Sequence, residues 1–495
     1  MNTIFHLAKK CPIGIWMLFF LIGCIPLGCL EPASSFPSLL IQDVHVWDAV
    51  SGLRKHQSVL LEGNTITAVG DIGTISLPRN TEQINGEGKY LIPGLWDAHV
   101  HLIFDKAVSP AMFDLFIYNG ITSVRDTGGH LEEVLPWRNK ARQNPDKYPR
   151  MMVAGPLIDG RNRVYDGSSV FNPDLAVGIS TEDEAVAVVE TMDSASVDLL
   201  KAYEMLSPEV FHTILKEAEK KGYVVTGHVP LSMDVTEASH AGLRSMEHLR
   251  NMSMACSESW QELLTERQEL LAEGKNTAGA ILRRNLHSRQ RYRALASQDS
   301  LRTQEVLSVL AANQTWQIPT AALNTSSIDR LYAQEGWQEN FAFLPTEARD
   351  KWLENAQRFA ENPVDSNRVN YANWTLDMIK KINDADIGLM AGTDTPIFYL
   401  TPGFSLHEEL ERFVRAGLSP EEALEAATLR PAQYFEMEGE LGSISSGKIA
   451  DLVLLNANPL ENIRNTTNIA AVVKNGNYMD RAELDELGDR LKGVE

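Results

Sequence analysis

The stretch Leu91-Ile-Pro-Gly-Leu-Trp-Asp-Ala-His-Val-His101 decides how the rest of this chain is interpreted. It is mostly apolar and ends in two histidines, His99 and His101, which in an extended strand face the same side. Two imidazoles placed in this way can hold one divalent metal ion if the strand ends at an open site. Taken alone, the pair is equally compatible with two histidines on a polar strand face.

Seven further short apolar runs alternate with helical patterns, as buried strands of βα units do. Four of these runs end in residues suited to a metal centre, namely Lys201, His228, His248 and Asp394. The other three runs span residues 120–126, 151–155 and 317–320. Eight such units predict an α/β fold with a distorted (β/α)8 TIM barrel, in which chemistry takes place at the C-terminal ends of the strands. The candidate ligands fall at those ends.

With these motifs the chain resembles the amidohydrolase superfamily, in its binuclear-metal form with a carboxylated lysine. Within that superfamily it is most similar to the imidazolonepropionase-like and prolidase-like branch. The resemblance rests on the 91–101 opening, on Gly392-Thr-Asp394 and on the closing segment 442–453. It extends from about residue 39 to residue 480.

The resemblance implies a set of metal ligands and two divalent ions, with zinc as the expected metal. The implied ligands are His99, His101, Lys201, His228, His248 and Asp394. The first two histidines would bind the more buried ion together with Asp394, and the other two would bind the second ion. Lys201, carboxylated on its amine to N6-carboxylysine, would bridge the two ions.

The residue types support these roles independently. Imidazole and carboxylate suit zinc and similar metals. A lysine ammonium has no acceptor and cannot bind a metal, but burial would lower the pKa of Lys201 and free its amine to react with carbon dioxide. The product is an anionic carbamate that can join two cations. Without its neighbours, Lys201 would be interpreted as a surface lysine.

Catalytic roles follow for Asp394 and Tyr203. A metal pair lowers the pKa of the water between the ions and polarises a substrate carbonyl. Asp394 could accept the proton of that water and pass it to the leaving amine. Because Thr395-Pro396 follows, Asp394 could instead cap a helix. Tyr203 could donate a hydrogen bond to the scissile carbonyl oxygen, or be a packed aromatic residue of the barrel rim.

The predicted function is hydrolysis of an amide or peptide-like C–N bond in a small molecule, such as an Xaa-Pro dipeptide or an N-acyl amino acid. Such substrates need a cation for their carboxylate, and Arg161, Arg163 and Arg250 are the candidates. One alternative is a mononuclear imidazolonepropionase-like or deaminase-like hydrolase of cyclic amides, in which Lys201 would have no bridging role. An alternative of another class is a catalytically silent surface lipoprotein that binds a metal or a ligand.

The N-terminus predicts export. Lys9 and Lys10 precede a short apolar stretch, so residues 1–23 are interpreted as a signal peptide and residues 24–37 as a tether. Leu21-Ile-Gly-Cys24 resembles a bacterial lipobox, which makes Cys24 the expected lipidation site and Cys29 a weaker one. We therefore expect a lipid-anchored protein on the periplasmic side of the bacterial cell envelope. Ordinary cleavage and an uncleaved anchor are the alternatives.

The domain plan places a barrel between two β-rich ends. Residues 38–92 and 437–482 are expected to build one small β-sandwich domain, and residues 93–436 the barrel. Helical insertions are expected at about 249–316 and 324–384, either as lids over the site or as external packing helices. After the leader, Cys256 is the single cysteine, so no intrachain disulfide is expected.

Composition bears on the domain plan and on the expected partners, and the remaining histidines bear on which residues line the site. The chain has 495 residues, 44% of them hydrophobic, which is ample for both domains. Its net charge of −21 argues against nucleic acid as a partner, while a homo-oligomer stays open. His212, His240 and His287 are expected at the surface. His130 could line the pocket, and His407 is expected only to support the site.

Overall fold

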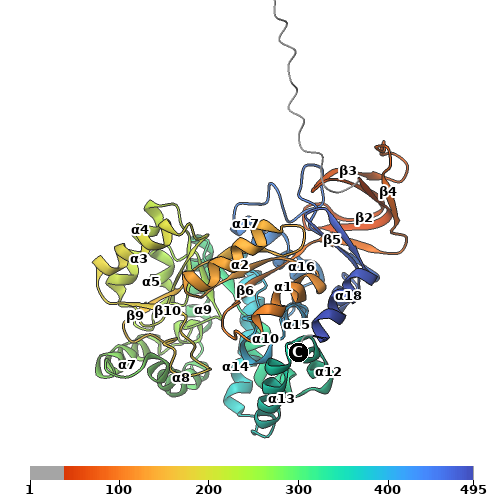
Figure 1. Ribbon diagram of the computed structural model, residues 1–495. Coiled ribbons are helices and arrows are strands. Elements are labelled where there is room, and N and C mark those ends of the chain that lie inside the picture. Colours follow the sequence, from red (N-terminus) through yellow and green to blue (C-terminus); the bar gives the residue numbers. More distant parts are fainter. Residues whose placement is uncertain (1–37, 494–495) are drawn as a thin grey trace, which may run out of the picture. The chain divides into compact units, whose positions relative to one another are not determined.

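The computed structural model (Figure 1) describes residues 38–493. The predicted signal peptide, tether and lipidation cysteines Cys24 and Cys29 lie outside the described residues. Seven parallel strands of the expected series are β6 (Leu95–Val100), β7 (Ile121–Asp126), β8 (Arg150–Val153), β11 (Leu200–Ala202), β12 (Val225–Gly227), β13 (Ser245–Glu247) and β14 (Trp316–Ile318).

These strands form two hydrogen-bonded sets. One set has the order β6-β7-β8, and the other has the order β10-β9-β11-β12-β13-β14. The strands β9 (Leu157–Gly160) and β10 (Ala176–Ile179) are additions that the sequence pattern did not predict. All pairs within both sets are parallel, which gives a mixed α/β fold with a TIM-barrel-like order of strands.

The eighth expected strand, residues 387–394, forms no regular ladder. It makes isolated parallel bridges instead, Leu389 with Gln317 on one side and Thr395 with Val100 on the other. The Ala98 amide also donates to the Ala391 carbonyl at 2.9 Å. The segment therefore lies between β14 and β6, where the eighth strand of a barrel would be.

Helices follow the strands along the chain. The helices of the βα units are α1 (Ser109–Tyr118), α2 (Leu131–Gln143), α3 (Glu182–Ser194), α4 (Pro208–Lys220), α5 (Val235–His240), α15 (Phe404–Arg415), α16 (Pro420–Ala426) and α17 (Leu429–Tyr434). Local sequence explains their ends, as α4 illustrates. The Ser207 side chain accepts a hydrogen bond from the Val210 amide, Pro208 occupies the first turn, and apolar residues such as Phe211 and Ile214 are buried.

Two long helical segments interrupt this series, after β13 and after β14. The first contains α6 (Met252–Ala255), α7 (Trp260–Glu273), α8 (Gly279–Ala296) and α9 (Ser300–Ala312). The second contains α10 (Ala321–Asn324), α11 (Ser326–Asp329), η1 (Leu331–Ala333), α12 (Glu335–Gln338), η2 (Glu339–Phe343), α13 (Thr346–Ala360) and α14 (Ser366–Asp384). In the second segment the Trp352 indole donates to Asp105 Oδ2 at 3.2 Å, which ties the segment to the loop after β6.

The two ends of the described chain build one sheet. Its strands are β1 (Leu39–Asp48), β2 (Gly52–Glu62), β3 (Thr65–Asp71), β4 (Glu82–Asn85), β5 (Tyr90–Pro93), β15 (Leu452–Leu455), β16 (Ile469–Lys474) and β17 (Asn477–Asp480). The order is β17-β16-β15-β5-β1-β2-β3, with β4 paired to β1. The antiparallel pairing of β5 with β15 joins the two sequence ends, and helix α18 (Arg481–Lys492) follows β17.

This sheet is a single hydrogen-bonded path, whereas the sequence predicted a sandwich of two sheets. Its two ends approach each other, because a Cβ at Gly476 would lie 1.9 Å from the Gly63 carbonyl oxygen. Residues from both ends of the path, among them Ile41, Ile66 and Leu454, share one apolar core. The bend encloses that core as a sandwich would, and Gly476, at a φ of +83°, permits the close approach.

Candidate metal centre

Three of the predicted ligands lie together at one end of the parallel strands. His99 and His101 leave β6 on the same side, and their Nε2 atoms each lie 3.1 Å from Asp394 Oδ1. One ligand atom from each of these three residues can be chosen so that all lie within 4.8 Å of one another. All three side chains are buried, with His99 at 0% exposure. The three residues can therefore hold one metal ion.

Asp394 is placed by the backbone and by a buried neighbour. Its amide donates to the His99 carbonyl at 2.8 Å, and Asp97 accepts hydrogen bonds from the Thr393 amide and hydroxyl at 3.0 and 2.7 Å. A Cβ on Gly392 would lie 2.9 Å from the His99 amide nitrogen, so only glycine permits this approach. Asp97 thus supports the segment that carries Asp394.

The Asp394 side chain faces the histidines and caps no helix. The short 3-10 helix η3 (Ile397–Tyr399) that follows has no side-chain cap. Burial disfavours ionisation of Asp394, but His248 and His99, together with hydrogen bonding from His101, hold its pKa well below the usual value. Asp394 is therefore an ionised carboxylate, the form that binds metals and accepts protons.

The other three predicted ligands complete the cluster. Lys201 Nζ lies 3.3 Å from His99 Nε2, and His248 Nε2 lies 3.7 Å from Asp394 Oδ2. The His228 and His248 ring centroids are 4.8 Å apart. Lys201 is 1% exposed, which excludes the surface lysine considered as its alternative. Burial lowers the pKa of Lys201 to about 8, so a substantial share of its amine is neutral near neutral pH.

The donor atoms fit a divalent metal. His228 Nε2 is buried and has no hydrogen-bond partner among the described residues, and Asp394 Oδ1 is buried beside the Nε2 atoms of His99 and His101. Burial lowers the pKa of His101 to about 4 and that of His228 to about 3, so both imidazoles are neutral, as metal ligands must be. Buried nitrogen and carboxylate donors of this kind are what zinc and similar metals bind.

Three residues that the sequence analysis missed hold the other ring nitrogens of the histidines. Glu247 contacts His99 Nδ1, Glu204 Oε1 lies 2.6 Å from His228 Nδ1, and Thr320 Oγ1 lies 2.8 Å from His248 Nδ1. Such partners fix the tautomer and orientation of a ligating histidine. The sequence positions of the two glutamates could have indicated this role. Glu247 directly precedes His248, and Glu204 follows Lys201 by three residues at a strand end.

Glu247 itself is held by Arg125 from β7. The Arg125 Nη2 group donates to both Glu247 carboxylate oxygens, at 2.9 and 3.2 Å, and both side chains are 0% exposed. Burial disfavours ionisation of Glu247, but Arg125 and His99 hold its pKa well below the usual value. A buried chain of contacts thus runs from Arg125 through Glu247 to His99.

Two tyrosines and two arginines lie next to the clustered candidate ligands. The Tyr203 ring lies 4.2 Å from the His228 ring and 5.9 Å from the Tyr165 ring, centroid to centroid, and Tyr203 is 3% exposed. Arg283, on α8 of the first insertion, has its Cζ 5.6 Å from the Tyr165 ring and its Nε 3.8 Å from Glu204 Oε2. Arg250 Nε lies 3.6 Å from Glu204 Oε1. The first insertion therefore contributes a side chain to this site.

Two of the predicted substrate-binding arginines are engaged elsewhere. The Arg161 side chain is 68% exposed and pairs with Glu184 at 3.2 Å. Arg163 pairs with Asp174 at 2.7 Å, and His130 contacts the same carboxylate at 3.1 Å. Of the three candidates, only Arg250 is near the clustered histidines. Tyr165 and Arg283, which lie there, have no sequence pattern that distinguishes them from other loop and helix residues.

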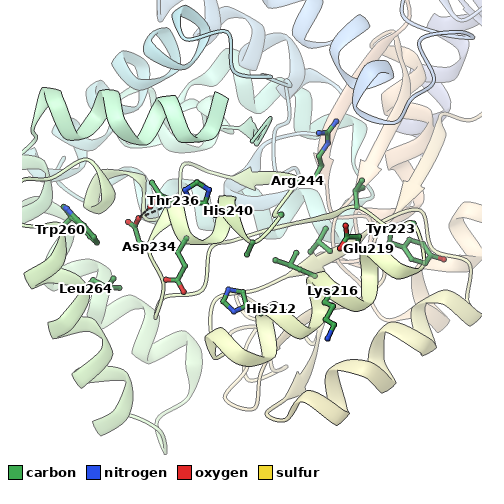
Figure 2. Close-up of a pocket in the computed structure, with 17 residues that line it drawn as sticks. His212, Lys216, Glu219, Tyr223, Asp234, Thr236, His240, Arg244, Trp260 and Leu264 are labelled. Atoms are coloured by element: carbon green, nitrogen blue, oxygen red, sulfur yellow. Dashed lines mark hydrogen bonds between the residues drawn. The ribbon is translucent and has the colours of Figure 1, made fainter. Parts of the chain in front are cut away.

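The remaining histidines lie apart from the cluster. His407 is buried between Thr466 Oγ1 at 2.9 Å and the Asn119 carbonyl at 3.1 Å, so it supports packing and not the site. His212 and His240 are exposed as expected, and both line a surface pocket of about 1090 Å³ beside α4 and α5, whose lining includes none of the six predicted ligands (Figure 2). His287 was expected at the surface, which is wrong, because its Nε2 atom is buried.

Comparison with known proteins agrees with this geometry. The model of the Amidohydrolase family matches residues 343–479. The adenine deaminase of Clostridium botulinum (strain Loch Maree / Type A3) is 35% identical over 72 residues, which are 14% of this chain and only 12% of that relative's length.

Solved structures share the fold over most of their length. A Xaa-Pro dipeptidase with bound methionine superimposes with a TM-score of 0.64 at 19% identity, covering 90% of this chain and 100% of that chain. A bottromycin amidohydrolase gives a TM-score of 0.67 at 22% identity, covering 93% of this chain and 92% of that chain. The family match covers residues 343–479 only, so it shows a local similarity to the Amidohydrolase family, and the solved structures share the fold of this chain.

Proposed function

We propose that the protein is a metal-dependent hydrolase that cleaves the C–N bond of a small amide, with an Xaa-Pro dipeptide or an N-acyl amino acid as the substrate class. The observation that carries this proposal is the convergence of six buried residues at the strand ends, with Lys201 3.3 Å from His99. The match of residues 343–479 to the Amidohydrolase family model and the fold shared with a Xaa-Pro dipeptidase support it.

We also propose that the parallel strands close into a distorted (β/α)8 barrel. The Val100–Thr395 and Gln317–Leu389 bridges support closure on one side. On the other side, the Asp198 amide, just before β11, donates to the Val153 carbonyl of β8 at 2.9 Å. Closure would bring the strand ends into one ring, which accounts for ligands from five strand ends meeting at one point.

In this proposal two divalent ions, zinc being the expected metal, occupy the cluster. His99, His101 and Asp394 would hold one ion, and His228 and His248 the other. Lys201, carboxylated to N6-carboxylysine, would lie between them. When bound, the ions would lower the pKa of a water molecule and polarise the substrate carbonyl.

The chain's own residues supply the remaining steps. Asp394 is ionised and buried beside the histidines, so it can accept the proton of the attacking water and return it to the leaving nitrogen. Burial, together with the nearby Tyr165, raises the pKa of Tyr203 well above its usual value, so its hydroxyl stays protonated and can donate to the carbonyl oxygen. Arg250 Nε and Arg283 Nε, which lie 3.6 and 3.8 Å from Glu204, would bind a substrate carboxylate.

A second candidate is a deaminase with one metal ion, acting on a cyclic amidine or amide. The local similarity to an adenine deaminase favours it. A mononuclear enzyme has no use for an anionic bridge, so Lys201 would then be dispensable for activity. Buried at the cluster with a lowered pKa, Lys201 favours the binuclear proposal.

For location, we propose export and lipid attachment at Cys24, with Cys29 as the weaker site, on the periplasmic side of a bacterial envelope. The proposal rests on the leader sequence. Within residues 38–493, no helix is both long enough and apolar enough to cross a bilayer.

The test is a substrate screen combined with Lys201→Ala. Zinc-loaded protein is assayed against dipeptides, N-acyl amino acids, lactones, hydantoins and aminopurines. We expect turnover of a dipeptide or an N-acyl amino acid, loss of that turnover in Lys201→Ala, and partial recovery with short-chain carboxylates that replace the carbamate. Deamination of an aminopurine, with full activity in Lys201→Ala, would overturn the proposal in favour of the second candidate.

A further inference from the structure

A small cavity lined by basic residues lies beside the candidate metal centre, under helix α8 of the first insertion. The polar residues that line it are Arg250, Asn251, Ser253, Arg267, His287, Gln290, Arg291 and Tyr371. No aspartate or glutamate is among these lining residues, all of which belong to the described part of the chain. Three guanidinium groups therefore face one cavity without a carboxylate in its wall.

Arg267 and Arg291 are in direct contact with neutral groups and not with a carboxylate, although Glu204 acts on both from a distance. Arg267 is 2% exposed, and it donates to the neutral oxygens Gln290 Oε1 and Asn251 Oδ1 at 2.8 and 2.7 Å. Arg291 has its Cζ 4.2 Å from the centroid of the Tyr371 ring. Neither arginine forms an ion pair with a carboxylate within residues 38–493. A buried cation without a counter-charge is costly to keep in the folded state.

Glu204, the carboxylate closest to Arg250, is already shared. Its Oε1 lies 2.6 Å from His228 Nδ1 and 3.6 Å from Arg250 Nε, and its Oε2 lies 3.8 Å from Arg283 Nε. One negative charge thus faces two arginines at the site itself. The same carboxylate also acts from a distance on Arg267 and Arg291, so it is shared among four arginines and the cluster around the cavity keeps an excess of positive charge.

Two buried nitrogen atoms have no hydrogen-bond partner where the cavity lies. Arg250 Nε and His287 Nε2 are buried and have no hydrogen-bond partner among the described residues, and both residues line the cavity. The cavity volume is about 10 Å³, which is room for about one water-sized particle. Phosphate, sulfate and organic carboxylates are too large for this space, whereas a chloride ion is only slightly larger than water.

We propose that this cavity binds one chloride ion, held by Arg250, Arg267 and Arg291. A chloride accepts hydrogen bonds from N–H groups and supplies the missing negative charge, whereas a water molecule would supply no charge. By holding Arg250, the ion would also fix the residue next to Glu204, which orients His228. The chloride site contains none of the six predicted metal ligands, but it shares Arg250 with the carboxylate-binding pair proposed above.

The direct test is a crystal of the whole protein soaked in bromide, which replaces chloride and is located by its anomalous scattering. We expect a single bromide peak among Arg250, Arg267 and Arg291. An empty cavity would overturn the proposal. Density without anomalous signal in bromide would also overturn it, because such density would come from water.

The solution test compares thermal unfolding in sodium chloride, sodium bromide and sodium gluconate at equal ionic strength. We expect a saturable rise in Tm of about 1–3 °C with either halide, and no such rise with gluconate. Arg291→Gln should lose the halide response, while Arg289→Gln, on the same helix with its side chain 59% exposed, should keep it. Equal Tm values in all three salts would overturn the proposal even if Arg291→Gln failed to fold.

Discussion

Replacing Glu247 with glutamine tests whether the buried carboxylate behind His99 holds the metal centre together. Glu247 is 0% exposed and contacts His99 Nδ1 on one side. On the other side it accepts two hydrogen bonds from Arg125 Nη2, at 2.9 and 3.2 Å. Glutamine keeps the size of the side chain but removes the charge that both neighbours require.

Two magnitudes follow from this geometry. Arg125 is 0% exposed and would be left without an anion, and breaking a buried ion pair in this way costs about 3–5 kcal/mol of unfolding free energy. His99 would lose the partner that orients it, and loss of such a partner lowers metal affinity by about 10- to 100-fold. Glu247→Gln should therefore weaken both folding and metal binding.

Denaturant unfolding of the metal-free protein and zinc competition with a chelator measure the two effects separately. The matched control is Arg125→Met/Glu247→Met, which removes both charges. It should regain much of the lost stability, since apolar residues can replace a buried pair, but metal affinity should stay low. A Glu247→Gln protein that binds zinc within twofold of wild type would refute the role of Glu247 at His99.

Further predictions concern the lysine, the aspartate and the leader. At fixed dissolved carbon dioxide, the carbamate on Lys201 of metal-free protein should rise by about tenfold or more between pH 7 and pH 9 until the site saturates, because its amine has a pKa lowered to about 8 and reacts only when neutral, and because the reaction also releases a proton. Carbon-13 NMR with labelled bicarbonate measures this, and a signal that does not change with pH would contradict it. Asp394→Asn should lower amide turnover by roughly two to four orders of magnitude, and turnover of an ester with a good leaving group by less, because only the amide leaving group needs a proton. Equal losses on both substrates, at unchanged metal content, would speak against a proton delivered by Asp394. Cys24→Ala should abolish labelling by a fatty-acid analogue; persistent labelling would move the lipid to Cys29, and an unlabelled wild-type protein would remove the lipid anchor altogether.

The sequence pattern alone predicted that the six candidate ligands lie close together. Each ends an apolar run, and parallel strands of βα units align their C-terminal ends, so strand order alone predicts proximity. The eighth run shows the limit of that reasoning. The apolar pattern of residues 387–394 predicted a strand, yet these residues form only isolated bridges. Such a pattern indicates that a segment is buried, but it does not show that the segment pairs in a regular ladder.

Contacts between segments distant in sequence could not be predicted. Arg283 lies in a charged helical pattern that indicates exposure, but packing of α8 brings it to Glu204, 79 residues earlier in the chain. The surface position expected for His287 was wrong for the same reason. Alternation of apolar residues predicted strands at both chain ends, but it did not predict which of these strands pair. The structure therefore has a single bent sheet around Leu454 where a sandwich was expected.

Metal stoichiometry tests the central claim most directly. Protein purified in the presence of bicarbonate and measured by elemental analysis should hold about two divalent ions per chain, and His228→Ala should hold about one. The His228→Ala protein should keep the ion assigned to His99, His101 and Asp394. A wild-type content near one ion per chain, unchanged in His228→Ala, would contradict the binuclear centre.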